Sequence, residues 1–270
     1  MRAGTSARLL RPARGRVGLA ARHPQPAVSW RAVTLRLAGG AVVLWGLISG
    51  IGLLLTHVLV SGPVHSADLG VDVWFAARRT GRWNTVTSVA TDMAQTYTAI
   101  AVTVVVALLL RWRLGRWYES WVLVTVMAGE LLVFLAVTLT VHRPRPPVVR
   151  LDVAPPTSSF PSGHTAAAVA LYGCIAILLL WAYGRHRATL AGAVVLWFIP
   201  VIVGLSRLYR GMHYPSDVLA GALTGGLWLL LVITTLLPRQ GLVGRRAGRP
   251  ASGTATRGGR RERAASRAGR

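Results

Sequence analysis

The chain has 270 residues and a formal net charge of +23, yet only 14% of its residues are charged and 53% are hydrophobic. A soluble domain usually carries about 25% charged residues, so this composition excludes an ordinary soluble protein and indicates an integral membrane protein. The single cysteine, Cys174, excludes an intramolecular disulfide and a cysteine-based metal cluster.

Both ends of the chain are rich in arginine. Residues 1–36 contain eight arginines, and residues 239–270 contain ten. The first 30 residues lack the apolar core of a signal peptide, so we expect both segments to be basic disordered tails. Such tails can bind anionic lipid headgroups, whereas no motif favours a nucleic-acid partner.

Between the tails, six apolar stretches have about the length that a helix needs to cross a membrane. They are residues 37–60, 95–110, 120–141, 165–183, 189–206 and 217–237. We therefore predict an all-α fold, in which residues 37–238 form one polytopic domain of six transmembrane helices. The longer connection at 62–92 is expected to form one or two interfacial helices, because it carries charged residues and tryptophans.

The placement of arginines predicts the orientation of this bundle. The two tails and the loops around residues 111–116 and 185–187 hold 23 of the 31 arginines, which places them and both termini in the cytoplasm. The connections left for the outer face are 61–94, 142–164 and 207–216. Topology does not explain the arginines of the last two connections, so a functional role is indicated for Arg143, Arg145, Arg150, Arg207 and Arg210.

The connection 142–164 ends in Pro161-Ser162-Gly163-His164, directly before an alanine-rich helix. Ser162 is typical of a helix N-cap, and Gly163 allows close approach of a ligand to the backbone. Free N–H groups and the helix dipole bind anions, so Ser162, Gly163 and His164 suit a phosphate cradle with a titratable imidazole. Simple N-capping is equally compatible with this segment.

The stretch 206–217 combines Arg207, His213 and Asp217. His213 and Asp217 are four residues apart, so the carboxylate can reach the imidazole if the helical path extends back to His213. That pairing would fix the tautomer of the ring, and Arg207 would offer a planar donor fork to phosphate oxygens. The alternative is a cationic interfacial loop that only anchors the next helix.

Three segments resemble the signature motifs of the type 2 phosphatidic acid phosphatase (PAP2) superfamily, which includes bacterial integral membrane lipid phosphatases. They are Arg145-Pro146, Pro161-Ser162-Gly163-His164, and Ser206-Arg207 with His213 and Asp217 at fixed spacing. The first motif departs from the family pattern, because Thr138 stands where the family has a lysine seven residues before its arginine. Arg143 is the nearest candidate to replace that cation.

The resemblance implies a metal-independent phosphatase that needs no cofactor. His213 would be the nucleophile and form a phosphohistidine, Asp217 would orient it, and His164 would protonate the leaving group. The residues expected to hold the phosphate oxygens are Arg145, Ser162, Gly163, Arg207 and Arg143. The implied substrate is a lipid phosphate or a prenyl diphosphate such as undecaprenyl diphosphate, hydrolysed at the outer leaflet of the cell membrane.

Two other functions remain compatible with the sequence. A lipid phosphotransferase would resolve the same phosphohistidine with an acceptor hydroxyl in place of water. A non-enzymatic lipid-binding or transport protein with a decayed site is the alternative from a different class. The sequence does not indicate an oligomeric state.

Other polar residues in or near the apolar stretches are given structural roles. Glu130, inside the third stretch, is expected to form a helix–helix hydrogen bond, with a functional role as the alternative. Asp68, Asp72 and Asp92 are expected to be interfacial or capping residues, and Arg210 is a candidate headgroup contact.

Overall fold

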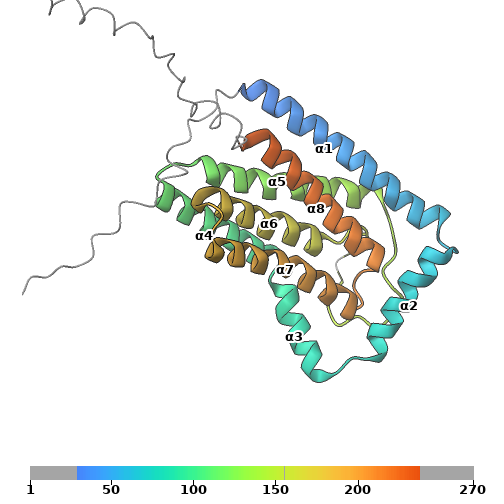
Figure 1. The fold of residues 1–270 in the computed structure, drawn as a ribbon. Helices are drawn as coiled ribbons and strands as arrows, with labels where there is room; N and C mark the ends of the chain where they lie inside the picture. The colour runs from blue at the N-terminus through green and yellow to red at the C-terminus, as the bar shows by residue number, and fades with distance from the viewer. Residues whose placement is uncertain (1–28, 155, 238–270) are drawn as a thin grey trace, which may run out of the picture. The chain divides into compact units, whose positions relative to one another are not determined.

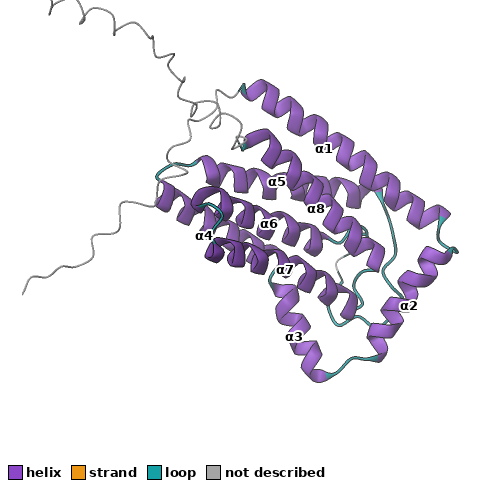
Figure 2. Cartoon of the chain, in the orientation of Figure 1, coloured by secondary structure: helices purple, strands orange, loops and turns teal. Residues whose placement is uncertain are grey.

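The computed structural model describes residues 29–154 and 156–237. Within these ranges the chain forms eight α-helices and one π-helical turn, and no strand (Figures 1 and 2). The elements are α1 Trp30–Leu53, η2 Leu54–Val58, α2 Pro63–Ala77, α3 Gly81–Asp92, α4 Thr96–Leu114, α5 Tyr118–Thr140, α6 Gly163–Tyr183, α7 Arg187–Tyr209 and α8 Pro215–Leu236. The predicted all-α fold is therefore confirmed for the described part of the chain.

Six helical segments are long and apolar enough to cross a membrane. They are Trp30–Val58, Thr96–Leu114, Tyr118–Thr140, Gly163–Tyr183, Arg187–Tyr209 and Pro215–Leu236. The prediction of six spanning helices is confirmed, and the bounds of the later five shift by only a few residues.

The first helix begins earlier than predicted. Residues 30–36 were assigned to the basic N-terminal tail, but they form the first turns of α1. The Ser29 side chain accepts a hydrogen bond of 3.5 Å from the Ala32 backbone N–H, which satisfies one of the free donors at the helix start. The remainder of both predicted tails lies outside the described residues.

Helix α6 is the centre of the bundle. Its apolar window is 72% buried, compared with 11% for that of α4, and it contacts α4, α5, α7 and α8. Figure 1 shows α6 between these neighbours. Because α6 begins at Gly163, the predicted phosphate-binding segment lies at one end of the most enclosed helix.

Small residues let α8 pack closely against the start of α6. A Cβ atom at Gly221 would collide with the carbonyl oxygen of Ser162, and one at Gly225 would collide with that of Ala166. Such close backbone contact is typical of small residues spaced four apart in membrane helices. The Ser162 N–H donates to the Asp217 carbonyl oxygen at 3.0 Å, so the two predicted motif segments are joined directly through their backbones.

The connection between α1 and α4 forms two helices, α2 and α3, as one of the predicted alternatives had it. They contact α7 and α8 at the end of the bundle that carries the motifs. Arg79, between α2 and α3, donates to the carbonyl oxygens of Tyr209 (3.0 Å) and Val149 (2.6 Å). This connection therefore packs against the loops that carry the predicted site.

Candidate active site

A cavity of about 600 Å³ opens between α4, α5 and the start of α6. Five predicted site residues line its polar end, namely Arg145, Gly163, His164, Arg207 and His213. The rest of its wall is mostly apolar and comes largely from α4 and α5. The fold thus brings the three motif segments to one cavity that continues as a groove between α4 and α5.

His213 lies in the turn between α7 and α8 and is 4% exposed. Its Nδ1 lies 2.7 Å from the carbonyl oxygen of Ser159. A carbonyl oxygen can only accept, so Nδ1 carries the proton and Nε2 keeps its lone pair. Burial lowers the pKa of His213 well below its usual value, and the charges of Arg207 and Arg145 lower it further. The ring is therefore neutral at physiological pH, as a nucleophile requires.

Asp217 is close to His213, but the structure does not pair them by a hydrogen bond. Asp217 Oδ2 lies 3.9 Å from His213 Nδ1 and instead accepts from the Tyr214 backbone N–H at 3.0 Å. The carboxylate therefore lies near the imidazole, as predicted, but no hydrogen bond joins the two groups. The first turn of α8 directs Oδ2 to its own helix start, and the Ser159 carbonyl takes the place of the orienting acceptor.

Arg145 and Arg207 both line the cavity and both have an unused donor. Arg145 Nη1 donates to the Met212 carbonyl oxygen at 2.8 Å, and Arg207 Nη1 donates to Asp152 Oδ2 at 2.9 Å. The Nε–H groups of both arginines are buried and have no hydrogen-bond partner among the described residues. A buried donor without a partner is costly, so these two groups suit an anion that enters the cavity.

The start of α6 places Gly163 and His164 on the cavity wall. Ser162 occupies the N-cap position, but its Oγ makes no capping bond and lies 3.0 Å from Thr165 Oγ1. Ser162 is fully buried and is not part of the cavity lining. Of the three residues predicted to form the phosphate cradle, Gly163 and His164 therefore line the cavity, whereas Ser162 does not.

Arg143 is placed differently from its predicted role as a phosphate ligand. Its Nη1 lies 2.5 Å from Asp217 Oδ1, and its Nη2 lies 2.9 Å from Asp68 Oδ2. The side chain is 4% exposed and is absent from the cavity lining. The structure therefore does not support Arg143 as a phosphate ligand. Two carboxylates that lie far apart in the sequence bind this guanidinium and hold it away from the cavity.

Arg210, the candidate headgroup contact, is also engaged inside the protein. It forms an ion pair of 2.5 Å with Asp152 Oδ1, and it donates to the Asn84 carbonyl oxygen at 3.0 Å. Burial alone would raise the pKa of Asp152, but its hydrogen bonds and ion pairs with Arg210 and Arg207 hold it below the usual range. Asp152 is thus an ionised anchor that joins the 142–162 connection to the end of α7.

Two polar residues of α5, Thr138 and Glu130, also line the cavity. Thr138, at the position of the family lysine, donates to the Phe134 carbonyl oxygen at 2.9 Å and brings no charge. Glu130 also lines the cavity, and its Oε1 is buried without a hydrogen-bond partner among the described residues. The helix–helix hydrogen bond expected for Glu130 is therefore not found at this oxygen.

Asp68 and Asp72 were expected to be interfacial or capping residues. Both are buried at the junction of α2 with the site, and Asp68 accepts from the Ser216 backbone N–H in the first turn of α8. Asp68 contacts Arg143 and the start of α8. Burial raises the pKa of Asp72 to about 8, and the charges of Asp68 and Asp217 add to this effect. Their four-residue spacing places them on one helix face, but no pattern in the sequence indicates what that face contacts.

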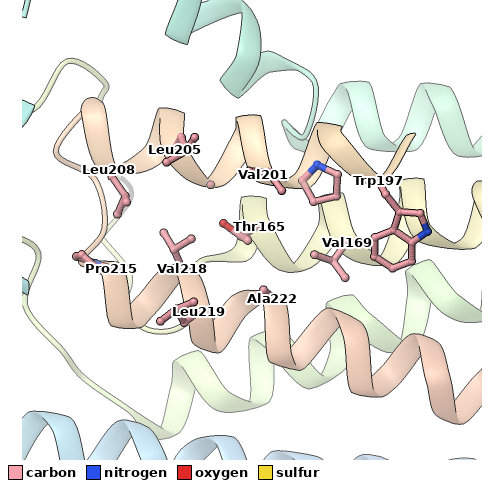
Figure 3. A pocket seen from close by; sticks show the side chains of 12 residues that line it. Thr165, Val169, Trp197, Val201, Leu205, Leu208, Pro215, Val218, Leu219 and Ala222 are labelled. Atoms are coloured by element: carbon pink, nitrogen blue, oxygen red, sulfur yellow. The ribbon is translucent and has the colours of Figure 1, made fainter. Parts of the chain in front are cut away.

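A second pocket, of about 430 Å³, lies between α6, α7 and α8 (Figure 3). Side chains of α7, such as Leu205, face those of α8, such as Val218, across this pocket, and Thr165 points toward it from α6. Its lining is otherwise apolar and contains no histidine or arginine. It therefore does not have the donors that a phosphate site needs.

Comparison with known proteins agrees with this geometry. A family model described as the PAP2 superfamily matches residues 118–240, which include the cavity residues of all three motifs. Residues 118–240 belong to the PAP2 superfamily.

The PAP2 fold extends over most of the described chain. A crystal structure of a transmembrane PAP2 type phosphatidylglycerolphosphate phosphatase from Bacillus subtilis aligns with a TM-score of 0.64 and 22% identity. The alignment covers 77% of this chain and 100% of that one. At this identity the likeness concerns the fold alone.

Several curated proteins share sequence with the PAP2 region. A lipid A 1-phosphatase of Rhizobium etli is 36% identical over 85 residues, which are 32% of this chain and 32% of that protein. A phosphatidylglycerophosphatase B of Bacillus subtilis is 38% identical over 31% of this chain and 44% of that protein. An undecaprenyl-diphosphatase of Sulfolobus acidocaldarius is 30% identical over 39% of this chain and 47% of that protein. The chain thus spans less than half the length of each of these relatives.

Proposed function

We propose that this protein is a membrane phosphatase that hydrolyses a lipid phosphate or a prenyl diphosphate through a phosphohistidine intermediate. One observation carries the proposal. The cavity combines two histidines and two arginines, whose Nε–H groups have no partner among the described residues, with a largely apolar wall along its length. Such a cavity suits a molecule that has a phosphate at one end and a hydrocarbon chain at the other.

In the first step, the lone pair on His213 Nε2 attacks phosphorus, and the bond between phosphorus and the leaving oxygen breaks. His164 donates a proton to that oxygen, so the lipid leaves as an alcohol or as a shorter phosphate. The Nε–H groups of Arg145 and Arg207 stabilise the charge that builds on the equatorial oxygens. These guanidinium groups supply positive charge in this mechanism, so no metal is needed.

In the second step, His164 takes a proton from water, and the water oxygen attacks the phosphorus of the phosphohistidine. The bond from phosphorus to His213 Nε2 breaks, inorganic phosphate leaves, and both histidines return to their starting states. The Ser159 carbonyl keeps the proton of His213 on Nδ1 in both steps. Asp217, 3.9 Å away, stabilises the positive charge that the ring carries as a phosphohistidine.

The apolar wall supports a lipid substrate. Side chains such as Ile100 and Val104 of α4 lie opposite others such as Val124 and Leu131 of α5. A hydrocarbon chain in this groove would be removed from water along its length. The relatives are named for phosphatidylglycerophosphate, lipid A 1-phosphate and undecaprenyl diphosphate, and these three lipids are the candidate substrates.

The active site is proposed to face the outside of the cell. The loops that carry it lie at the end of the bundle opposite the arginine-rich loops at residues 111–116 and 185–187. The positive-inside rule places those arginine-rich loops in the cytoplasm.

The test is a phosphate-release assay of the purified protein in lipid micelles with phosphatidylglycerophosphate, phosphatidate and undecaprenyl diphosphate. We expect release from at least one lipid, persistence in EDTA, inhibition by orthovanadate, and loss in the His213→Ala and His164→Ala variants. His213→Ala should also abolish acid-labile labelling of the protein by a lipid with radioactive phosphate. Turnover near the wild-type rate in His213→Ala would disprove the nucleophile. Transfer of phosphate to an added alcohol in preference to water would identify a phosphotransferase.

A further inference from the structure

The guanidinium group of Arg143 is buried and contacts two carboxylates, a hydroxyl group and an aromatic ring. Nη1 lies 2.5 Å from Asp217 Oδ1 and 2.7 Å from Ser216 Oγ, and Nη2 lies 2.9 Å from Asp68 Oδ2. The carbon Cζ lies 4.4 Å from the centre of the Tyr214 ring. This arginine therefore points to Asp68 and Asp217, and it is not among the residues that line the cavity.

Asp68 holds this arrangement from outside the PAP2 region. It lies on α2, is 4% exposed, and precedes residues 118–240 in the chain. Besides Arg143, its carboxylate contacts both the backbone N–H of Ser216, at 3.0 Å, and the Ser216 hydroxyl. Asp68 thus satisfies a free N–H at the first turn of α8, one residue before Asp217.

Together these contacts fix the Asp217 carboxylate. Oδ1 is held by Arg143 and Oδ2 by the Tyr214 N–H, so the carboxylate cannot rotate toward or away from His213 without breaking a charge-assisted hydrogen bond. Arg143 also balances a carboxylate that is otherwise buried without a counter-charge, and removal of one partner from such a pair is strongly unfavourable.

We propose that Asp68 and Arg143 are positioning residues for the phosphate chemistry, acting through Asp217 and not through contact with the substrate. The chain of ion pairs from Asp68 through Arg143 to Asp217 keeps the carboxylate at a set distance from His213 Nδ1. This inference rests on the proposed phosphohistidine mechanism. It assigns a functional role to α2, and it replaces the idea that Arg143 stands in for the missing lysine at Thr138.

The test is a steady-state comparison of Asp68→Asn, Arg143→Gln and the double variant with wild type, with orthovanadate as the phosphate-like probe. Each single variant should lower kcat about 10- to 100-fold, the range for loss of an outer partner of a buried site, and leave KM within about twofold. The inhibition constant of orthovanadate should change by less than about twofold, because neither residue touches the anion. The double variant should lose less than the product of the two single losses, because one side chain acts through the other.

Matched controls separate positioning from general loss of structure or charge. Asp92→Asn and Arg82→Gln remove the same charges at exposed positions in the same connection and should keep wild-type kcat. Arg143→Lys keeps one cation beside Asp217 but cannot bridge to Asp68, so it should recover part of the kcat lost in Arg143→Gln. If Asp68→Asn does not fold, the comparison of kcat between Arg143→Lys and Arg143→Gln still tests the inference.

Three results would overturn the inference. One is a KM or orthovanadate constant that rises tenfold in Arg143→Gln at constant kcat, which would make Arg143 a phosphate ligand. Another is a kcat of Asp68→Asn equal to that of Asp92→Asn, when the wild-type protein hydrolyses the lipid. The third is an Arg143→Lys variant no more active than Arg143→Gln. A wild-type protein that releases phosphate from none of the lipids would overturn the proposed function and this inference together.

Discussion

The Nδ1–H of His213 donates to the backbone carbonyl oxygen of Ser159 over 2.7 Å, whereas the nearest oxygen of Asp217 is 3.9 Å away. A backbone carbonyl thus sets the tautomer of the proposed nucleophile. In a serine-protease triad, the carboxylate has both tasks: it fixes the tautomer and it stabilises the charged ring. Here the two tasks fall to different groups, and this division has a measurable consequence.

Asp217→Asn should be less damaging than the same change in a serine-protease triad. The Ser159 carbonyl keeps the proton on Nδ1, so only the electrostatic support of the ring is lost. We expect kcat to fall about 10- to 100-fold. In a serine-protease triad the same change also alters the tautomer of the histidine and lowers kcat about 10⁴-fold. Steady-state kinetics with a lipid substrate check this, with His213→Ala as the inactive reference. A fall near 10⁴-fold would mean that Asp217, and not Ser159, sets the tautomer.

Arg207→Lys should weaken phosphate binding. Arg207 lines the cavity, uses Nη1 for Asp152, and has an Nε–H without a partner among the described residues. A single ammonium group cannot bind Asp152 and a phosphate in the same way. We expect KM and the orthovanadate inhibition constant to rise about tenfold, which corresponds to about 1.4 kcal/mol. Arg187→Lys, at the exposed opposite end of α7, should leave both constants unchanged. Equal constants in Arg207→Lys and wild type would remove Arg207 from the phosphate site.

Ala128→Trp should block the hydrocarbon groove without blocking the phosphate end. Ala128 lines the cavity from α5, and its exposed side chain leaves room for an indole to enter the groove. We expect at least tenfold slower hydrolysis of long-chain lipids and an unchanged rate with a small soluble aryl phosphate. Ala101→Trp, on an exposed part of α4 that does not line the cavity, is the matched control. Equal losses with both kinds of substrate would contradict a chain-binding groove.

Asp72→Asn should change how stability depends on pH. The pKa of Asp72 is raised from 3.8 to about 8, so the folded protein holds a proton that the unfolded chain releases near pH 4. The folded state therefore binds more protons between these values, and stability falls as pH rises. As the pH rises from about 4 to about 8, the melting temperature of the wild type should fall relative to that of Asp72→Asn. Above about pH 8 it should fall no further. Thermal melts in detergent over this range check the trend. A difference in melting temperature between wild type and Asp72→Asn that stays constant with pH would refute the assignment.

Cysteine labelling should establish which side of the membrane the active site faces. The native Cys174 is fully buried, so a membrane-impermeant maleimide will report mainly on an introduced cysteine. Val153→Cys, in the exposed part of the motif loop, should be labelled in intact cells. Trp117→Cys, between α4 and α5, should be labelled only after permeabilisation. The reverse pattern would invert the proposed orientation.

Much of this protein follows from local sequence alone. Hydrophobic stretches of about 20 residues predict spanning helices because the thickness of the hydrocarbon core sets their length. The motif residues His164, Arg207 and His213 were predicted from fixed spacings and do line one cavity, because each lies at or next to the end of a helix. Local physics determines these features, so a single sequence is enough to predict them.

The partners of the charged groups were decided only by the tertiary structure. Arg143 meets Asp68 across 75 residues of sequence, and His213 meets Ser159 across 54. No local pattern encodes such pairs, because they depend on how α2 and the 142–162 connection dock on α7 and α8. A buried charge is strongly unfavourable without a partner, and the packing of distant segments decides which group that partner is. The sequence therefore determined the spanning helices and the chemical groups of the site, whereas the packing decided which arginines face the cavity and which one holds Asp217.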